Sequence, residues 1–449
     1  MAIQAAIFVN APAKGDEGTP RAFLKAGGIS LLERQLRQLT KMGVKRVALI
    51  SKTFTEKLEA ARFKQAPAKV EIHNQNALKG GRLWNARDDV LLLEEGVLVD
   101  ARIMKAVTTK PGGRRVAVFP GNTVIYNKGH GLKLKAKGGD YLFASAALVK
   151  GADLLAAIKD RDFRARPLKA VLKAALNSGR AALADIGKID TYLQDRRRNV
   201  DILWRPVVSG AETGKATRAL IGMAQKGVLD WPARWIHPFF ENALVAMLCP
   251  TPVTPNFITL ITTVVGFYVT WLFATGDMLW GLAGALVIGV LDGVDGKLAR
   301  TKMLQSRIGE LEHIADKVVE YSWYFGIAWY LAGAEGNALP WALAVMIVLF
   351  AWAEVVQGEF FRRFTGKQLD DAGKFERAFR IIGARRNTQI WALIPFALLD
   401  QWLMGFWVVA IYAALTFFVA QARFIIRLRD YGSEKSLEIK KNIGDTAYF

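Results

Sequence analysis

Six long apolar segments in the second half of the chain restrict its fold more than any other feature. They lie at about 257–275, 279–298, 311–332, 339–358, 388–400 and 402–426. Because an α-helix rises about 1.5 Å per residue, most of these segments can cross a hydrocarbon core of about 30 Å. The fifth is shorter and contains Pro395. The pattern predicts an all-α domain with six transmembrane helices.

Basic residues lie at only one end of these segments. The turns 275–278, 331–339 and 399–402 contain no Lys or Arg, whereas the loop 359–387 contains eight. Lys and Arg collect on the cytoplasmic side of membrane proteins. Both termini are therefore predicted to lie in the cytoplasm, with the protein in the cytoplasmic (inner) membrane.

The net charge of the chain is strongly positive, with 61 Lys and Arg against 40 Asp and Glu. Such an excess suits nucleic acid, an anionic membrane surface or a phosphate-rich substrate. The apolar segments favour the membrane. The lipid bilayer is therefore an expected partner, and nucleic acid is not.

The first 200 residues have a different pattern. Short strand-like runs, such as 45–51 and 115–119, alternate with helical ones, such as the amphipathic stretch 31–43. This alternation predicts an α/β domain with a mostly parallel sheet. The N-terminal run MAIQAAIFVN lacks the charged start and long apolar core of a signal peptide, so we expect this domain to stay in the cytoplasm.

These patterns divide the chain into four regions. They are an α/β domain at 1–200, a linker at 201–230, a membrane domain at 231–430 and a cytoplasmic tail at 431–449. Within the membrane domain, the stretch 231–249 mixes four aromatic residues with Arg234 and His237. This mixture is typical of an amphipathic helix lying in the membrane interface, where His237 would be a polar anchor.

A group of acidic residues lies where the second apolar segment meets a basic loop. Asp292, Asp295, Gly296 and Ala299 are spaced i, i+3, i+4 and i+7, which places them on one face of a helix. The two small residues would let the phosphates of a ligand approach the backbone.

A second pair of acids, Glu312 and Asp316, is spaced i, i+4 on the next predicted helix. Four carboxylates at the ends of two apolar helices would repel one another, so a divalent cation is the expected partner. Ligands that are all oxygen atoms suit Mg²⁺, Mn²⁺ or Ca²⁺ better than Zn²⁺.

The spacing of these acids resembles the CDP-alcohol phosphotransferase family, whose pattern is Asp-x2-Asp-Gly-x2-Ala-Arg-x8-Gly-x3-Asp-x3-Asp. The first half matches Asp292, Asp295, Gly296, Ala299 and Arg300. In the second half, strict counting from Gly309 reaches His313 and Lys317. A register one residue shorter reaches Glu312 and Asp316, keeps the carboxylate pair, and is the one we adopt.

The resemblance implies a reaction and a set of roles. The family displaces CMP from a CDP-linked donor by the hydroxyl of an alcohol, forming a phosphodiester, and its members are typically homodimers. The implied metal ligands, for two Mg²⁺ or Mn²⁺ ions, are Asp292, Asp295, Glu312 and Asp316. Asp316 is also the implied general base. The implied nucleotide and phosphate contacts are Asn256, Gly296, Ala299 and Arg300.

Further charged residues are candidates for binding the acceptor alcohol. Glu354 lies inside the fourth apolar segment, where a carboxylate is costly and suggests a function. It lies about one turn from the cytoplasmic end, so reaching the interface explains it equally well. Basic residues that suit a phosphate on the acceptor are Arg362, Arg363, Arg385 and Arg386. The positive-inside bias accounts for the same arginines without a ligand.

Residues 20–50 resemble the sugar-1-phosphate nucleotidyltransferase family, which implies a Rossmann-like nucleotidyltransferase domain. That family binds nucleotide phosphates with a glycine-rich loop after its first strand, whereas the segment NAPAKGDEGTPR has only Gly15 and Gly18. A metal-binding acid after a central strand could be Glu94, Glu95 or Asp100.

Two interpretations of the first domain stay open. It is either an active cytidylyltransferase or a degenerate domain kept for folding, docking or regulation. The first would resemble the bifunctional inositol-phosphate cytidylyltransferase/di-myo-inositol phosphate phosphate synthases.

The substrates and the function class also have alternatives. The donor can be a CDP-polyol or CDP-diacylglycerol, and the second would make this an enzyme of phospholipid synthesis. Acids in apolar helices also occur in ion-coupled transporters, but those acids lie near the bilayer midplane, whereas these lie at predicted cytoplasmic ends. A scaffold with an inactive site would follow if Glu312 could not complete the metal site.

Overall fold

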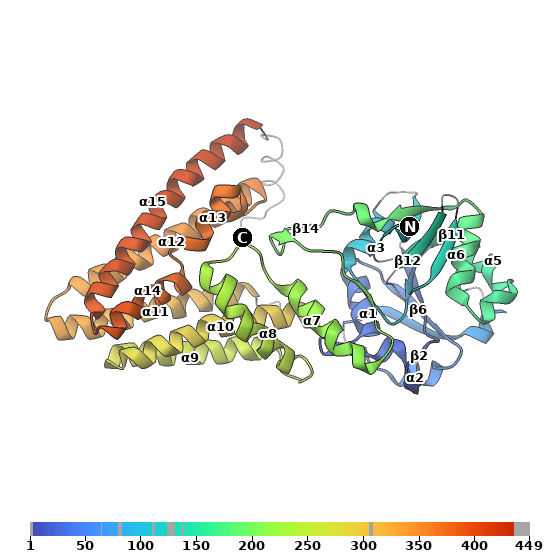
Figure 1. Cartoon of the computed structure of the whole chain (residues 1–449), viewed down its shortest axis with the longest axis horizontal. Helices are drawn as coiled ribbons and strands as arrows, with labels where there is room; N and C mark the ends of the chain where they lie inside the picture. Colours follow the sequence, from blue (N-terminus) through green and yellow to red (C-terminus); the bar gives the residue numbers. More distant parts are fainter. Residues whose placement is uncertain are drawn as a thin grey trace. The chain divides into compact units, whose positions relative to one another are not determined.

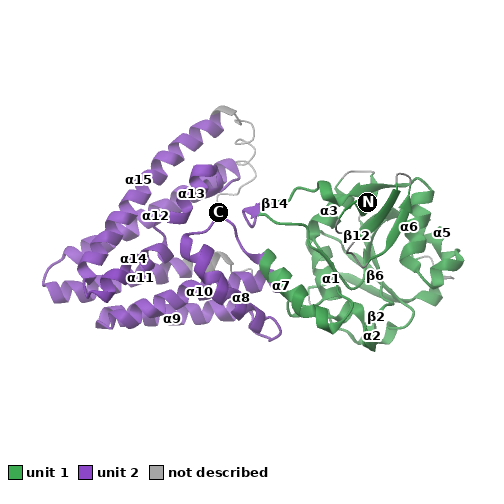
Figure 2. Ribbon diagram, in the orientation of Figure 1, with its two compact units in different colours: residues 1–192, 199–223 green, residues 193–198, 224–449 purple. Residues whose placement is uncertain are grey.

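The chain folds into two units, coloured separately in Figure 2. Unit 1 is Met1–Tyr192 with Asn199–Met223, and unit 2 is Leu193–Arg198 with Ala224–Phe449. The computed structural model describes residues 3–63, 65–79, 83–109, 113–123, 131–136, 139–304 and 309–434, without the side chains of 309–314 and 433–434.

Unit 1 is built on an eight-stranded sheet in the order β13-β10-β12-β8-β1-β6-β7, with β11 beside β12. Figure 1 labels β6, β11 and β12 of this sheet. The strands are β1 (Gln4–Phe8), β6 (Arg46–Ser51), β7 (Lys69–Asn74), β8 (Asp89–Glu94), β10 (Arg114–Pro120), β11 (Lys133–Ala136), β12 (Gly139–Lys150) and β13 (Ala181–Asp185). The central strands β8, β1, β6 and β7 are parallel, whereas β12 is antiparallel to both of its main neighbours. The predicted α/β domain with a mostly parallel sheet is confirmed.

Short strands lie outside this sheet. They are β2 (Pro12–Ala13), β3 (Asp16–Pro20), β4 (Lys25–Ala26), β5 (Ile29–Ser30), β9 (Val97–Val99), β14 (Tyr192–Leu193), β15 (Arg198–Asn199) and β16 (Trp204–Pro206). The antiparallel pair β2–β3 is the folded form of the glycine-poor segment after β1.

Two hydrophobic cores join most helices of unit 1 to the sheet, and a smaller cluster contains Ala216 of the last helix. The helices are α1 (Leu31–Lys41), α2 (Thr55–Ala60), α3 (Ala101–Thr108), α5 (Gly151–Ile158), α6 (Pro167–Asn177) and α7 (Thr213–Ala224). Side chains alternate along a strand, so Ile7 of β1 joins the core with Leu36 of α1, whereas Phe8 joins the core with Leu172 of α6. The stretch 201–230, expected as a linker, contains β16 and α7, and the unit boundary falls after Met223.

Unit 2 is helical, and each of the six apolar segments coincides with a helix. They are α9 (Pro255–Thr275), α10 (Met278–Lys302), α11 (Gly309–Glu335), α12 (Leu339–Thr365), α14 (Arg386–Leu398) and α15 (Trp402–Glu434). In the part of the chain that the structure describes, α9, α10, α12 and α15 are long and apolar enough to cross a membrane. A membrane domain is thus supported, while the count of six spans stays a prediction.

The segment before α9 has an unusual distribution of side chains. A π-helical turn at Pro232–Ile236 leads into α8 (His237–Leu248). Trp235, Phe239 and Phe240 are exposed, whereas His237 and Glu241 are buried. An aromatic outer face and a polar inner face suit a helix in contact with lipid headgroups, so the interfacial location remains our expectation.

Candidate active site

A cavity of about 1130 Å³ lies within unit 2. It brings together eleven of the thirteen site residues expected from the sequence: Asn256, Asp292, Asp295, Gly296, Ala299, Arg300, Asp316, Glu354, Arg362, Arg385 and Arg386. Arg363 is not part of the lining and pairs with Glu359, its Nε 3.0 Å from the carboxylate. The side chains of Glu312 and His313 lie outside the described residues.

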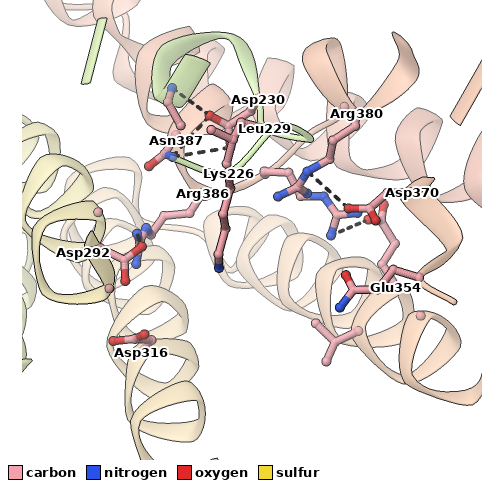
Figure 3. Close-up of a pocket in the computed structure, with 18 of the residues that line it drawn as sticks. Lys226, Leu229, Asp230, Asp292, Asp316, Glu354, Asp370, Arg380, Arg386 and Asn387 are labelled. Carbon is pink, nitrogen blue, oxygen red and sulfur yellow. Dashed lines mark hydrogen bonds and ion pairs between the residues drawn. The ribbon is translucent and has the colours of Figure 1, made fainter. Parts of the chain in front are cut away.

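The acids of α10 and α11 gather at one end of this cavity, and Figure 3 shows Asp316 near Asp292. Arg386, at the start of α14, donates from Nη2 to Asp292 Oδ2 over 2.6 Å. Thr259 of α9 donates its hydroxyl to Asp295 Oδ2 over 2.9 Å. Asp292 and Asp295 therefore have different hydrogen-bond donors, a guanidinium group and a hydroxyl group.

The other end of the cavity is lined by ion pairs. Their members come from α12, α13 (Lys374–Ile382), the loop before α13, the start of α14 and the segment 193–198. Arg385 lies 3.1 Å from Glu354, which explains how a carboxylate is kept inside α12. Asp370 is shared by Arg197, at 2.7 Å, and Arg380, at 3.5 Å (Figure 3). Burial raises the pKa of Asp370, but these arginines outweigh it and hold the pKa below its usual value.

The segment 225–230, which precedes the first apolar helix, also reaches the cavity. Lys226 and Asp230 both line it, and Asp230 accepts hydrogen bonds from the side-chain nitrogen of Asn387 at 3.3 and 3.4 Å. Sequence reasoning missed these residues, together with Arg197, Asp370, Arg380 and Glu320. Lys226 and Asp230 lay in the expected linker, and only the three-dimensional fold brings the others to the site.

Buried polar side chains form contacts between α8 and the acidic end of α10. Lys297, two residues after Asp295, places Nζ 2.7 Å from Glu241 Oε2 and 2.7 Å from Asn242 Oδ1. Any side chain at Gly293 would collide with the Glu241 carboxylate. The glycine next to Asp292 thus makes room for the acid that holds Lys297.

The residue types at the acidic end fit a divalent metal ion. The carboxylates of Asp292, Asp295 and Asp316 line one cavity, and all their ligand atoms are oxygens, as Mg²⁺ and Mn²⁺ prefer. Within the described residues, no three His, Cys, Asp or Glu side chains already stand together as a metal-binding group. Arg386 supplies the positive charge at Asp292 in this arrangement.

Glu94, Glu95 and Asp100, the candidates for a metal-binding acid in unit 1, all form hydrogen bonds within that unit. Glu95 Oε1 accepts the backbone N–H groups of Asn10 and Ala11, directly after β1, both at 2.7 Å. Glu94 accepts from the Ser145 hydroxyl at 2.6 Å, and Asp100 caps α3 and pairs with Arg102 at 2.7 Å. Burial raises the pKa of Glu94 and of Glu95 to about 7.

Comparison with known proteins identifies the helical unit. The family model for CDP-alcohol phosphatidyltransferases matches residues 252–383, which include α9 to α12 and the acids of α10 and α11. Unit 2 contains a CDP-alcohol phosphatidyltransferase domain. The resemblance drawn from the acidic pattern is confirmed, and with it the enzyme class: a CDP-alcohol phosphotransferase acts on a CDP-linked donor and an alcohol.

Relatives are similar across both units. A protein of Aquifex aeolicus (strain VF5) named bifunctional IPC transferase and DIPP synthase is 24% identical over 407 residues, covering 88% of this chain and 90% of the relative. A protein of the same name from Thermococcus kodakarensis is 29% identical over 199 residues, 43% of this chain and 44% of the relative.

Among solved structures, one described as a glucose-1-phosphate thymidylyltransferase from Bacillus anthracis, in complex with sucrose, is similar at a TM-score of 0.36 and 10% identity. The aligned region covers 48% of this chain and 94% of the thymidylyltransferase chain. A likeness at this level decides nothing about unit 1.

Proposed function

We propose that unit 2 transfers a polyol phosphate from a CDP-polyol, with CDP-inositol as the first candidate, to a hydroxyl of a phosphorylated inositol, and releases CMP. The observation that carries this proposal is the cavity, which has the carboxylates of α10 and α11 at one end and arginines paired with Glu354 and Asp370 at the other. The printed names of the relatives, IPC transferase and DIPP synthase, support the choice of inositol.

In the proposed reaction, the acceptor oxygen forms a bond to the phosphorus of the polyol phosphate while the bond from that phosphorus to CMP breaks. Asp316 takes the proton of the acceptor hydroxyl, and the electron pair of the broken bond leaves with CMP. Arg300, with the small residues Gly296 and Ala299, faces the diphosphate, and Asn256 lies at the nucleotide end. A divalent metal, held by Asp292, Asp295, Glu312 and Asp316, would neutralise developing charge when bound.

The basic end of the cavity suits a phosphate on the acceptor. Arg385 is one-third exposed despite its pair with Glu354, and Arg380 and Arg197 share a single carboxylate. Guanidinium groups bind phosphate through paired N–H donors. We assign acceptor binding to this wall, including Arg362, and propose Glu354 as the group that orients Arg385.

CDP-diacylglycerol remains the alternative donor, because α9, α10, α12 and α15 of the described part of unit 2 are long and apolar enough to cross a membrane, where a lipid donor would be present. The charge bias of the loops supports a cavity open to the cytoplasm and an inner-membrane location. A homodimer is proposed only because it is typical of the CDP-alcohol phosphotransferases that the sequence resembles.

A second activity in unit 1, cytidylyl transfer, is favoured by the relative that aligns over 407 residues and is named for two functions. The hydrogen bonds to Glu95 argue against cytidylyl transfer in unit 1. The backbone N–H groups after β1 donate to Glu95, so a nucleotide phosphate would have to displace a carboxylate of the chain. We propose that unit 1 does not synthesise the donor.

The test uses the purified full-length protein in detergent with Mg²⁺ or Mn²⁺. CDP-inositol and CDP-diacylglycerol are supplied separately with inositol, inositol phosphate and glycerol phosphate, and CMP release is followed. We expect release with CDP-inositol and inositol phosphate, and at least a 100-fold loss in Asp295→Asn. Asp277→Asn, at an exposed turn outside the cavity, is the matched control.

Two further results of this assay are decisive. Release only with CDP-diacylglycerol would replace the proposed donor by the lipid one. A parallel reaction with CTP and inositol phosphate should give no pyrophosphate, whereas its formation would restore the bifunctional interpretation.

A further inference from the structure

Lys226 lies on a short segment whose backbone is fixed at three points. Arg300 Nε donates to the carbonyl of Ala224 at 2.8 Å, and Arg198 Nε donates to the carbonyl of Gln225 at 3.0 Å. Gly227 N donates to the carbonyl of Arg196 at 2.8 Å. A Cβ atom at Gly227 would lie 2.6 Å from the carbonyl oxygen of Arg197, so this close approach requires glycine.

The side chain of Lys226 extends from this segment into the cavity. Figure 3 shows it between the Asp292–Arg386 pair and the Arg380–Asp370 pair. No hydrogen bond or ion pair connects its ammonium group to any residue of the described ranges, although other cations around the cavity have carboxylate partners. The ammonium group of Lys226 therefore has no partner among the described residues and is positioned to bind a ligand in the cavity.

The charges around Lys226 are mostly of the same sign. The charged groups that act on it are Arg300 and Asp292 on α10 and Arg196 and Arg197 on the segment 193–198. Burial, reinforced by Arg300 and Arg197, lowers the pKa of Lys226 to about 8, and Asp292, which opposes this effect, is already bonded to Arg386. An oxyanion in the cavity would supply the missing negative charge.

We propose that Lys226 is a substrate-binding residue of the active site, and that its ammonium group donates to a phosphate oxygen. It lies before the family domain at 252–383, so the acidic pattern of that domain does not include it. The inference rests on the proposed function in one respect: the phosphate belongs either to the diphosphate of the donor or to the phosphorylated acceptor.

Steady-state kinetics of the full-length protein separate these sources. Lys226→Met should raise one Michaelis constant about 10- to 100-fold, the value of one charged hydrogen bond. A rise in the KM of the donor places the lysine on the diphosphate, and a rise in the KM of the acceptor places it on the acceptor phosphate. Lys226→Arg should recover most of the loss, since it keeps the charge.

The control variant is Lys374→Met, which removes an exposed lysine of α13 that does not line the cavity. It should leave both Michaelis constants unchanged. The proposal is overturned if Lys226→Met keeps both constants within twofold of the wild type. It is also overturned if only kcat and the melting temperature fall, because that pattern belongs to a structural residue.

A binding measurement keeps this result independent of turnover. Calorimetric titration of the wild type with CDP, and separately with inositol phosphate, should show that Lys226→Met weakens one of them about tenfold or more. If the wild type transfers nothing with any substrate pair and yet shows this difference, the proposed reaction fails and Lys226 stands as a phosphate ligand. Equal affinities of both proteins for both probes would refute the role of Lys226.

Discussion

At the scale of single residues, the two acids of α10 have distinct neighbours. Asp292 is bonded to Arg386, which lies 94 residues further along the chain, and Asp295 accepts from Thr259, 36 residues before it. The helical spacing was enough to place Asp292 and Asp295 on one face. It contains no information about which side chains of α9 and α14 face them, because those contacts depend on how the helices pack.

Asp316 is the residue to which we assign proton transfer. Asp316→Asn keeps the shape of the side chain but removes its basicity, so kcat should fall about 10²- to 10⁴-fold. CDP binding, measured by titration calorimetry, should stay within a few-fold of the wild type. A variant that folds and transfers at the full rate would remove Asp316 from the mechanism, and Asp277→Asn again serves as the control.

At the scale of helices, the contact between α8 and α10 could not be predicted from the sequence. The stretch 231–249 is recognisable by its aromatic residues, but Glu241 shows no sign in the sequence that it is buried against Lys297. His237, expected as a polar anchor in the membrane interface, is instead 2% exposed and lines the cavity.

The Glu241–Lys297 pair should be important for stability. Lys297→Met leaves the Glu241 carboxylate buried without its cation, which costs about 3–5 kcal/mol. The double change Lys297→Met with Glu241→Leu should recover most of this loss, because an apolar pair needs no compensation. The measurement is the free energy of unfolding in mixed detergent and SDS.

The importance of this pair for stability is contradicted if Lys297→Met is as stable as the wild type. It is also contradicted if the double variant is no more stable than Lys297→Met alone. Lys374→Met, which removes an exposed lysine, provides the baseline.

At the scale of the whole molecule, the two kinds of domain, the apolar helices and five strands of the main sheet followed from periodicity, whereas β7, β11 and β13 were not predicted. The predicted strand runs and the six apolar segments all coincide with elements of the structure. The boundary between units did not follow. Residues 193–198 belong to unit 2 and α7 begins in unit 1, and such an excursion of the chain depends on contacts and leaves no mark in composition.

The stability of unit 1 should depend on pH. In unit 1, burial raises the pKa of Glu94 and Glu95 to about 7, above an ordinary value of about 4.5. The folded state then binds more protons than the unfolded state between these values, so stability falls as the pH rises from about 4.5 to 7 and levels off above 7. The loss should be roughly 1–3 kcal/mol for each glutamate.

Calorimetry of the full-length protein between pH 4.5 and 8 tests this slope. Glu94→Gln with Glu95→Gln removes both titrating groups and should flatten the profile of the unit 1 transition. A double variant with the same slope as the wild type would show that other groups are responsible.

The hydrogen bonds from Asn10 and Ala11 to Glu95 have a consequence for the cell that makes this protein. If the chain cannot activate a polyol with CTP, then every molecule of donor must come from another enzyme and diffuse to the membrane. The rate of product formation would then follow the supply of activated polyol. A cell with abundant transferase and no such enzyme would make no product.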